Sequence, residues 1–545
     1  MILLAKIKNL KFPKSLWVIF VFALFIRVSA VAYGLPLMLN SDEPSLVSGV
    51  LSLKDTALVL SRFDWPHLHF YLNFVFYVIV ILITRILGIF DVGNIIGTDL
   101  SIYFYTSRII NSLMGALTIF PVFLFAKNLL QSKKKAILVA FLFSIMPVHV
   151  VDSHLALLDT AMTFWLSISL YFSSNLIFSY TRKNFVLAGL FFGLAFSTKY
   201  TCFLYIFYFT LLLLVISGLD FRFDLTYNLN SIRKAAKKMF SKFNILNYLY
   251  FFITSIAVYL VTNFSIFIKP EVFWSNTYGR GFLFQFENVG EKQGFEYPAS
   301  LYENFIKQGF TDYGFTLLAI MLIIFILFLF FSYRNKITLL TVFFPLFFYF
   351  FISTKDRSPS HYFIFLYPLI TISVVSFLSD LSSYLRKSFK FFGRIPKSVL
   401  LYVLYSIAIF SPLSLTLKDT YRYINGDTRT EFRKWVIDKS EKSIPIFYYG
   451  ENMESVTFPK DIVYEKIVFV DIGFMETSSP YSYLVLGMKD LQEESLTGQD
   501  KDVEEIDGGE QDVIEHGVLV KKFMSSGRLG PNIYVFKINN DFKND

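Results

Sequence analysis

The sequence is poor in cysteine and in charge. Cys202 is the single cysteine in 545 residues, which excludes an intrachain disulfide and a zinc site built from several cysteines. Charged residues make up only 17%, below the roughly 25% of an ordinary soluble domain, whereas hydrophobic residues make up 54% and aromatic residues 19%. A soluble multidomain protein is therefore excluded for most of the chain, and the composition indicates a polytopic membrane protein.

The charges are unevenly distributed along the chain. From Thr416 onward, 130 residues carry 16 Lys and Arg against 24 Asp and Glu, whereas the preceding 415 carry 35 basic and 18 acidic residues. The basic residues of the first part occupy short gaps between apolar runs, which is typical of cationic loops beside a membrane and not of nucleic-acid binding. We therefore expect a membrane domain over 1–415 and a soluble acidic domain over 416–545.

Apolar runs long enough to cross a bilayer recur throughout the first domain. The first begins at Leu16 after four lysines and continues past Ala30 without a convincing cleavage site, so we interpret it as an uncleaved span and not a signal peptide. The expected spans, about eleven in all, are 16–36, 108–127, 136–151, 160–180, 185–198, 201–218, 247–268, 313–332, 337–353, 362–380 and 398–415.

One further apolar stretch, 67–90, decides the topology. If it lies in the membrane interface without crossing, the loops on the N-terminal side of the membrane hold 23 Lys and Arg against three acidic residues. If it crosses, every later loop changes side and the Lys133–Lys135 cluster falls outside. The positive-inside rule favours the first arrangement, with a cytoplasmic N-terminus and an extracytoplasmic C-terminal domain in the plasma membrane. The alternative is a twelfth span.

In this topology the outer loops are 37–107, 152–159 and 269–312, and unusual polar residues gather at that membrane edge. Ionisable groups at membrane depth are costly and tend to serve a function. In the first outer loop, Asp42 and Glu43 are adjacent carboxylates beyond an apolar helix, placed where a carboxylate could accept a proton from an incoming hydroxyl. A solvated pair of acids is the ordinary alternative.

The second outer loop is too short to hold a domain, yet it carries Asp152, His154 and Asp159. The two aspartates share a face if the segment is helical. They could orient a substrate, hold a divalent cation together with His154, or cap the following span. These alternatives remain open at the level of sequence, and a metal cofactor is neither required nor excluded.

Cations at the same edge suit a phosphate group carried on a lipid. Lys199 interrupts an otherwise apolar hairpin, and Arg357 lies near His361 in the turn between two later spans. Arg108 opens the second span. Arg27 lies within the first span and could pair with an acid across the bundle or extend outward.

The order of these motifs resembles a known family. Arg27 followed by Asp42–Glu43, then RIINSLMGALTIFPVFLFAKNLL (108–130), MPVHVVDSHLALLDTAMTFW (146–165), GLAFSTKYT (193–201) and HYFIFLYP (361–368), is similar to the C-type (GT-C) glycosyltransferases. Within that group the resemblance is to the dolichyl-phosphate-mannose–protein mannosyltransferases and the aminoarabinose transferases of lipid A. It extends to DTRTEFRKWVIDKSEKSIPI (427–446), which resembles the entry to the outer domain of such enzymes, and so covers nearly the whole chain.

The resemblance implies a GT-C fold and inverting transfer of a hexose or pentose. The donor would be a dolichyl- or undecaprenyl-phosphate sugar, and the acceptor a hydroxyl or phosphate of a protein, lipid or glycan at the outer face. It places the catalytic acids at Asp42, Glu43 and Asp159, and it makes Lys199, Arg357 and Arg108 candidates for the donor phosphate. Asp152, His154 and His361 are candidates for contact with substrate or metal.

Two departures from the family pattern bear on which transfer reactions and acceptors are expected. All five tryptophans are isolated, so the WWD-type motif of oligosaccharyltransferases is missing and transfer of a preassembled oligosaccharide is not expected. The 269–312 loop has no room for the long insertion of eukaryotic protein mannosyltransferases.

The region 416–545 is expected to form a small α/β domain, with a helix at 429–439, short strands at 444–450, 481–487 and 532–538, and a solvated acidic loop at 492–512.

Two other classes of function compete with glycosyl transfer. A transporter or flippase would show two halves with matching interrupted helices and charges through the bilayer midplane, and the sequence shows neither. A membrane scaffold would leave Asp42, Lys199 and Arg357 without purpose.

Overall fold

The computed structural model describes residues 12–88, 100–219, 225–277, 280–284, 336–355, 360–439, 444–450, 453–458, 462–466, 481–488 and 517–539. The chain divides into two compact units. Unit 1 comprises 1–31, 45–98 and 102–419, and unit 2 comprises 32–44, 99–101 and 420–545. A short segment near the start of the chain, 32–44, therefore folds with the C-terminal region.

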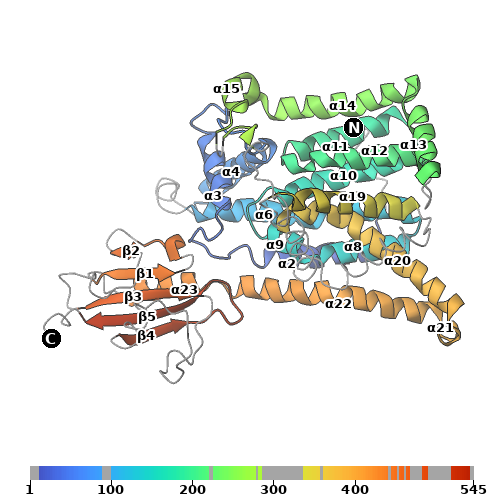
Figure 1. The fold of residues 1–545 in the computed structure, drawn as a ribbon. Coiled ribbons are helices and arrows are strands. Elements are labelled where there is room, and N and C mark those ends of the chain that lie inside the picture. The colour runs from blue at the N-terminus through green and yellow to red at the C-terminus, as the bar shows by residue number, and fades with distance from the viewer. Residues whose placement is uncertain are drawn as a thin grey trace. The chain divides into compact units, whose positions relative to one another are not determined.

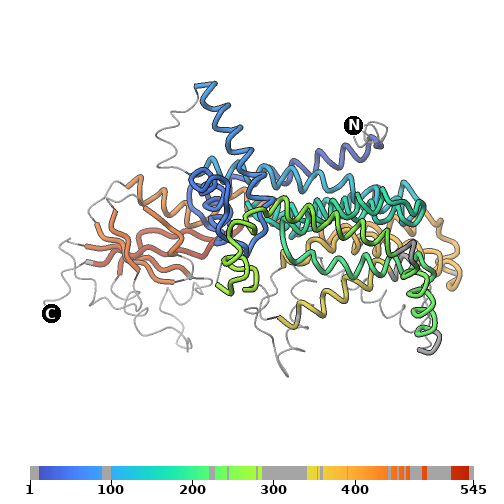
Figure 2. The backbone as a smooth tube through the Cα atoms, turned by 90° about the horizontal axis from the view of Figure 1, so that it is seen from above, coloured from blue at the N-terminus to red at the C-terminus, as the bar shows by residue number. Residues whose placement is uncertain are grey.

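Unit 1 is helical. Its helices are α2 (Lys14–Val28), α3 (Glu43–Ser52, which unit 2 enters), α4 (Leu68–Ile86), α6 (Ser101–Leu117), α7 (Ile119–Leu130), α8 (Lys133–Ser144), α9 (Pro147–Ser153), α10 (Asp159–Asn175), α11 (Arg182–Phe196), α12 (Tyr205–Ile216), α13 (Leu225–Met239), α14 (Lys242–Thr262), α15 (Pro270–Phe273), α19 (Lys336–Ser353), α20 (Tyr367–Ser388), α21 (Lys390–Arg394) and α22 (Lys397–Ile424). The 3₁₀ turns η1 (Tyr200–Leu204), η2 (Phe264–Phe267) and η4 (Ser360–Leu366) join some of them. Helices α10, α11 and α14 run side by side (Figures 1 and 2).

Among the described residues, five helices are long and apolar enough to cross a membrane, and α8 with α9 forms a sixth if that bent pair is one span. This confirms a mostly helical protein with several apolar helices. Helices also occupy the described parts of the other expected spans, while the expected span at 313–332 lies outside the described residues. The number of eleven spans and the orientation of the termini stay predictions.

Helix α4 takes a different course from the bundle. It is one of the five helices long and apolar enough to cross, yet Figure 2 shows it running across the direction of α10, α11 and α14. The expectation that 67–90 does not cross stays a prediction.

Glycines allow close approach of two long helices. A Cβ added to Gly189 would lie 2.4 Å from the Phe251 carbonyl oxygen, and one added to Gly193 would lie 2.8 Å from the Ser255 carbonyl oxygen. Two residues with small side chains, four positions apart on a helix, let its backbone touch that of a neighbouring helix. In lipid this close packing drives helix association, because the hydrophobic effect does not favour it there. Gly189 and Gly193 thus determine how closely α11 packs against α14.

Unit 2 contains a five-stranded sheet in the order β2-β1-β3-β5-β4. The strands are β1 (Ile446–Gly450), β2 (Tyr464–Lys466), β3 (Tyr481–Met488), β4 (Val518–Phe523) and β5 (Asn532–Asn539), and helix α23 (Thr428–Lys439) precedes them. Strands β2, β1 and β3 are parallel, β5 is antiparallel to its neighbours, and a bulge between Leu519 and Lys521 interrupts the β4–β5 ladder. The expected helix and strands are present, whereas the acidic loop 492–512 lies outside the described residues.

The core of unit 2 includes an early part of the chain. Leu37 is 1% exposed and packs in one cluster with Phe432, Val485 and Val535. The Tyr33 hydroxyl also donates a hydrogen bond of 3.0 Å to the Asp427 carboxylate. These contacts attach the segment just before Asp42 to the C-terminal domain.

Substituting Gly189 by alanine tests the close approach of the two helices. Because its new methyl group meets backbone that cannot rotate away, we expect a loss of about 1–3 kcal/mol in stability. The measurement is the unfolding temperature of the detergent-solubilised protein. Leu190→Ile, on a half-buried position of the same helix, is the control, and equal unfolding temperatures for both variants would contradict the packing described here.

Candidate functional site

A sharp bend between α8 and α9 shapes the site. The two helices meet at 59°. The bend is local to Pro147, which lacks an N–H and disfavours helical backbone at the preceding residue, and Met146 is accordingly extended with ψ 119°. A bend frees carbonyl groups, and inside a membrane those groups need protein partners.

Arg27 and Thr416 supply these partners. The Arg27 guanidinium donates through Nη1 to the Ser144 carbonyl at 3.1 Å and through Nη2 to His149 Nδ1 at 3.0 Å. The Thr416 hydroxyl donates to the Ile145 carbonyl at 2.7 Å. Arg27 is fully buried. In these bonds it neither extends outward nor pairs with an acid, and it holds the bend that precedes the 152–159 loop.

The loop between α9 and α10 is fixed from both sides. The Asn111 amide donates to the Leu155 and Leu157 carbonyls at 2.7 and 2.6 Å. One carboxylate oxygen of Asp152 accepts hydrogen bonds from the Thr160 N–H at 3.0 Å and hydroxyl at 2.7 Å. Of the three roles open to Asp152 at the level of sequence, the geometry shows that of a cap on the first turn of α10.

The central interaction is a buried ion pair between α10 and the end of α11. Lys199 Nζ lies 2.7 Å and 2.6 Å from the two carboxylate oxygens of Asp159. The Asp159 side chain is 3% exposed, whereas that of Lys199 is 14% exposed. Lys199 therefore keeps a small accessible surface while its partner is enclosed.

The surroundings keep Lys199 charged. Burial by itself lowers the pKa of Lys199, but the Asp159 carboxylate and the nearby Tyr362 and Asp152 raise it more, to above the usual 10.5. The ammonium also lies 4.5 Å from the centre of the Tyr362 ring, within the range of a cation–π interaction. This side chain is thus a fixed positive charge at neutral pH.

Tyr362 was not among the residues singled out from the sequence. It lies in the aromatic run of η4, where nothing distinguishes it from core residues, and only the packing of η4 against α9 and α10 brings it to Lys199. Tyr200, next to Lys199, contacts Tyr259 and Phe282 with ring centres 6.4 and 5.0 Å apart. An aromatic ring, that of Tyr362, thus adjoins the positive charge.

A second polar group missed in the sequence lies in the segment 37–107, between α3 and α4. Arg62 binds both oxygens of Asp64, at 2.9 and 2.6 Å, and its guanidinium lies 4.9 Å from the Trp65 ring centre. Asp64 is close enough to Tyr200 to interact with it electrostatically. The pairing of Arg62 with a residue two positions away gives no signal in the sequence, because such spacings are common in ordinary loops.

Asp42 and Glu43 differ in exposure. Asp42 is exposed and directly precedes α3, whereas Glu43, the first residue of that helix, is buried. The Asn40 side chain accepts hydrogen bonds from the backbone N–H groups of both, at 3.0 and 3.3 Å, and so fixes the local backbone. Asp42 and Glu43 lie in or at the edge of unit 2, whereas Asp159 and Lys199 belong to unit 1.

The structure brings together Asp152 and Asp159, which were predicted from one motif, and Lys199, which was predicted from another. Arg108 is buried in α6 and donates to the Val31 carbonyl at 2.8 Å. His154 is buried, with Nε2 3.0 Å from the Ile26 carbonyl. His361 packs against Tyr362, and Arg357 lies outside the described residues. The roles predicted for these residues stay predictions.

Within the part of the chain that the structure describes, no group of three or more His, Cys, Asp or Glu side chains is arranged to hold a metal ion. His154 and Asp152, the candidate ligands, make the backbone and threonine contacts given above.

Comparison with known proteins gives a family for the segment that carries this site. Residues 103–227 match the family model described as dolichyl-phosphate-mannose-protein mannosyltransferase. The expected resemblance to the protein mannosyltransferases is confirmed over these residues. The matched segment contains Arg108, Asp152, His154, Asp159 and Lys199.

The chain is also similar to solved structures. ArnT from Cupriavidus metallidurans bound to undecaprenyl phosphate matches with 13% identity over 97% of this chain and 99% of that one, with a TM-score of 0.46. The apo state of that ArnT gives 11% identity over 96% and 97%, with a TM-score of 0.45. The S. cerevisiae protein O-mannosyltransferase Pmt1-Pmt2 complex bound to the sugar donor gives 19% identity over 51% of this chain and 36% of that one, with a TM-score of 0.33. No curated protein matches the sequence.

A double-mutant cycle tests the buried ion pair. Lys199→Ala leaves the Asp159 carboxylate buried without its partner, and we expect it to lower the free energy of unfolding by about 3–5 kcal/mol. Lys199→Ala combined with Asp159→Ala removes both charges and is expected to cost clearly less than the sum of the single changes. Denaturant titration of the purified protein measures both effects, and strict additivity would show that the charges do not interact.

Proposed function

We propose that this protein is an inverting membrane glycosyltransferase that takes its sugar from a polyprenyl-phosphate carrier. The observation that carries the proposal is the Lys199–Asp159 ion pair, a fixed ammonium with a small accessible surface. It lies within the segment that matches the protein mannosyltransferase family. The aromatic rings of Tyr362 and Tyr200 beside it suit a phosphate that carries an apolar chain.

In the proposed reaction an acceptor oxygen forms a bond to the anomeric carbon of the donor sugar. The bond between that carbon and the phosphate oxygen breaks, and the polyprenyl phosphate leaves with the electron pair. The acceptor proton passes to a carboxylate. A lipid phosphate is already a stable leaving group, so alignment and charge stabilisation are the main tasks of the protein.

Each of the described side chains is proposed for a separate role in this reaction. Lys199 would stabilise the charge on the departing phosphate, because it is positive and partly accessible. Asp159 would position Lys199, because both of its oxygens contact the ammonium. Asp42 is the candidate base: it is exposed on a backbone fixed by Asn40, whereas Glu43 is buried. Arg357 and Arg108 remain candidates for further contact with the phosphate.

The proposal extends to topology and acceptor. Reaction at the extracytoplasmic face of the plasma membrane follows from the distribution of cationic loops, with the N-terminus inside. The acceptor would be a hydroxyl or phosphate group of a protein, lipid or glycan. Transport of a lipid-linked solute is favoured less, because Arg27, Asp159 and Lys199 lie at helix ends: the last turn of α2, the first residue of α10 and just beyond α11.

Replacing Asp42 by asparagine tests the base. The amide keeps the shape but cannot take a proton, so we expect sugar transfer to fall by about 100-fold or more. Purified protein is incubated with a panel of polyprenyl-phosphate sugars and acceptors, and free lipid phosphate is measured. Asp55→Asn, an exposed aspartate after α3, is the matched control, and turnover of Asp42→Asn at the control rate would remove Asp42 from the mechanism.

Substitutions of Lys199 test the phosphate contact. Lys199→Gln is expected to raise the KM for the donor about tenfold or more while changing the KM for the acceptor little, because the lost charge faces the phosphate. Lys199→Arg should recover part of this loss. Lys355→Gln serves as a control at a second lysine, which lies 5.8 Å from the ring centre of Phe351. Equal effects on both KM values would contradict a donor-specific role.

A further inference from the structure

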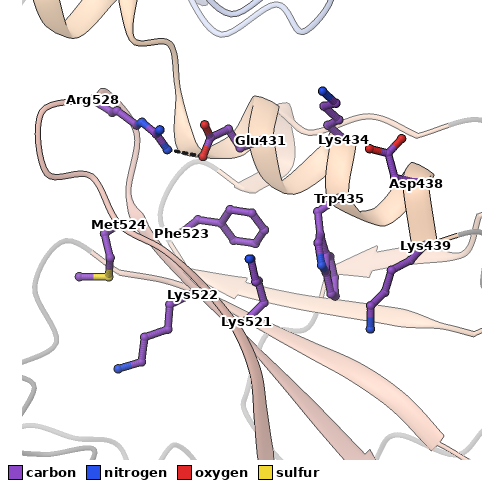
Figure 3. Close-up of a pocket in the computed structure, with 10 residues that line it drawn as sticks. All are labelled: Glu431, Lys434, Trp435, Asp438, Lys439, Lys521, Lys522, Phe523, Met524 and Arg528. Carbon is purple, nitrogen blue, oxygen red and sulfur yellow. Dashed lines mark hydrogen bonds and ion pairs between the residues drawn. The ribbon is translucent and has the colours of Figure 1, made fainter.

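A cleft in unit 2 lies between α23 and β4, with a volume of about 570 Å³ (Figure 3). Its size falls within the range of small-molecule sites, roughly 300–1,000 Å³. Ten residues line it: Glu431, Lys434, Trp435, Asp438, Lys439, Lys521, Lys522, Phe523, Met524 and Arg528. All of them belong to one compact unit, so the cleft does not depend on how the two units are arranged.

The cleft is basic although its domain is acidic. Its lining includes five Lys and Arg against two acids, whereas the chain from Thr416 onward has 16 basic against 24 acidic residues. One of those acids, Glu431, already forms an ion pair with Arg528 at the edge of the cleft. A positive site on a negative domain would attract an anion specifically to this position.

An aromatic surface lies among the charges. Trp435 is half-buried, with part of its ring packed on the core of the sheet. Figure 3 shows Trp435 between the side chains of Lys521 and Lys439. Lys439 Nζ lies 4.8 Å from the Trp435 ring centre, and Lys521 Nζ lies 6.0 Å from that of Phe523.

The bulge in β4 explains this arrangement. Alternate residues of a regular strand point to opposite faces. Leu519 pairs with Phe536, whereas Lys521 pairs with the neighbouring Val535, so the extra residue between them places Lys521 on the side of the strand opposite to Leu519, which is also the side of the buried Phe523. Lys522 lies at the edge of the cleft, with Nζ 5.9 Å from the Tyr534 ring centre. Bulges commonly redirect side chains at sheet edges, and here one directs a lysine into the cleft.

We propose that this cleft binds an anionic saccharide, with Trp435 against the apolar face of a sugar ring and Lys521 and Lys439 on its carboxylate or phosphate groups. An indole face suits the C–H groups of a pyranose, and flanking ammonium groups suit its acidic substituents. The binding of this saccharide does not depend on the proposed function. Its role as part of the acceptor does.

Binding to the full-length protein in detergent tests the proposal without any donor lipid. The probes are tetragalacturonate, the neutral maltotetraose and inorganic phosphate, each titrated by calorimetry. We expect tetragalacturonate to bind and maltotetraose to bind at least tenfold more weakly, since it lacks the charges. Inorganic phosphate should bind more weakly than tetragalacturonate, because it cannot contact Trp435.

Variants separate the two parts of the site. Lys521→Gln should raise the Kd for tetragalacturonate about tenfold, and Trp435→Ala by a similar factor, while Trp435→Phe keeps most of the affinity. Lys466→Gln, on β2 at the opposite edge of the sheet, is the control and should change nothing. Lys521 is exposed, so its substitution leaves the fold intact.

The proposal fails if tetragalacturonate does not bind, if phosphate binds equally tightly, or if Lys466→Gln weakens binding as much as Lys521→Gln. Sugar transfer measured on the same variants distinguishes this site from the proposed function. Release of lipid phosphate by transfer of the donor sugar to water, without added acceptor, should be unchanged in Lys521→Gln, because that residue is not among those proposed for the reaction. Loss of saccharide binding with unchanged release would support an acceptor site, whereas absent release in the unmodified protein would contradict only the glycosyltransferase proposal.

Discussion

The buried ion pair of Lys199 and Asp159 is the interaction on which the site in unit 1 depends. It joins the first residue of α10 to the residue just beyond α11, two helices that touch along much of their length. In an apolar interior each of these charges alone would be very costly, so the pair forms as a unit. The same enclosure that makes the pair necessary also fixes the position of the ammonium, and a fixed charge requires little reorganisation when a phosphate approaches.

The geometry around the pair follows from a proline. Pro147 ends the regular course of α8, and the carbonyl groups freed at the bend are satisfied by Arg27 and Thr416, which come from opposite ends of unit 1. A charged side chain deep in a helix bundle usually suggests a ligand or an ion path. Here its hydrogen bonds to backbone explain a large part of its presence, and Arg27 supports the loop that carries Asp152 and Asp159.

Much of this arrangement was predictable from sequence. The apolar runs predicted the positions of most described helices, because a helix that crosses the bilayer needs a long stretch of apolar residues. The charged residues Asp152, Asp159 and Lys199 were found because each interrupts such a run. Tyr362 and Arg62 were not found, since an aromatic residue among aromatics and a charge in an ordinary loop have no contrast with their surroundings. The partners of Arg27 also could not be predicted, because they depend on a bend whose direction only packing sets.

The segment that carries Asp42 has a further consequence for how the protein is made. It is synthesised before most of unit 1, yet Leu37 is buried in a core formed with Phe432 and Val535, and Tyr33 binds Asp427. During translation this segment must wait until the helices of unit 1 and the strands of unit 2 have been synthesised before its native partners exist. The helices can therefore enter the bilayer one after another, while the loop between the first two acquires its final structure last. Cellular quality control that detects a misfolded C-terminal domain would then also detect a misfolded loop.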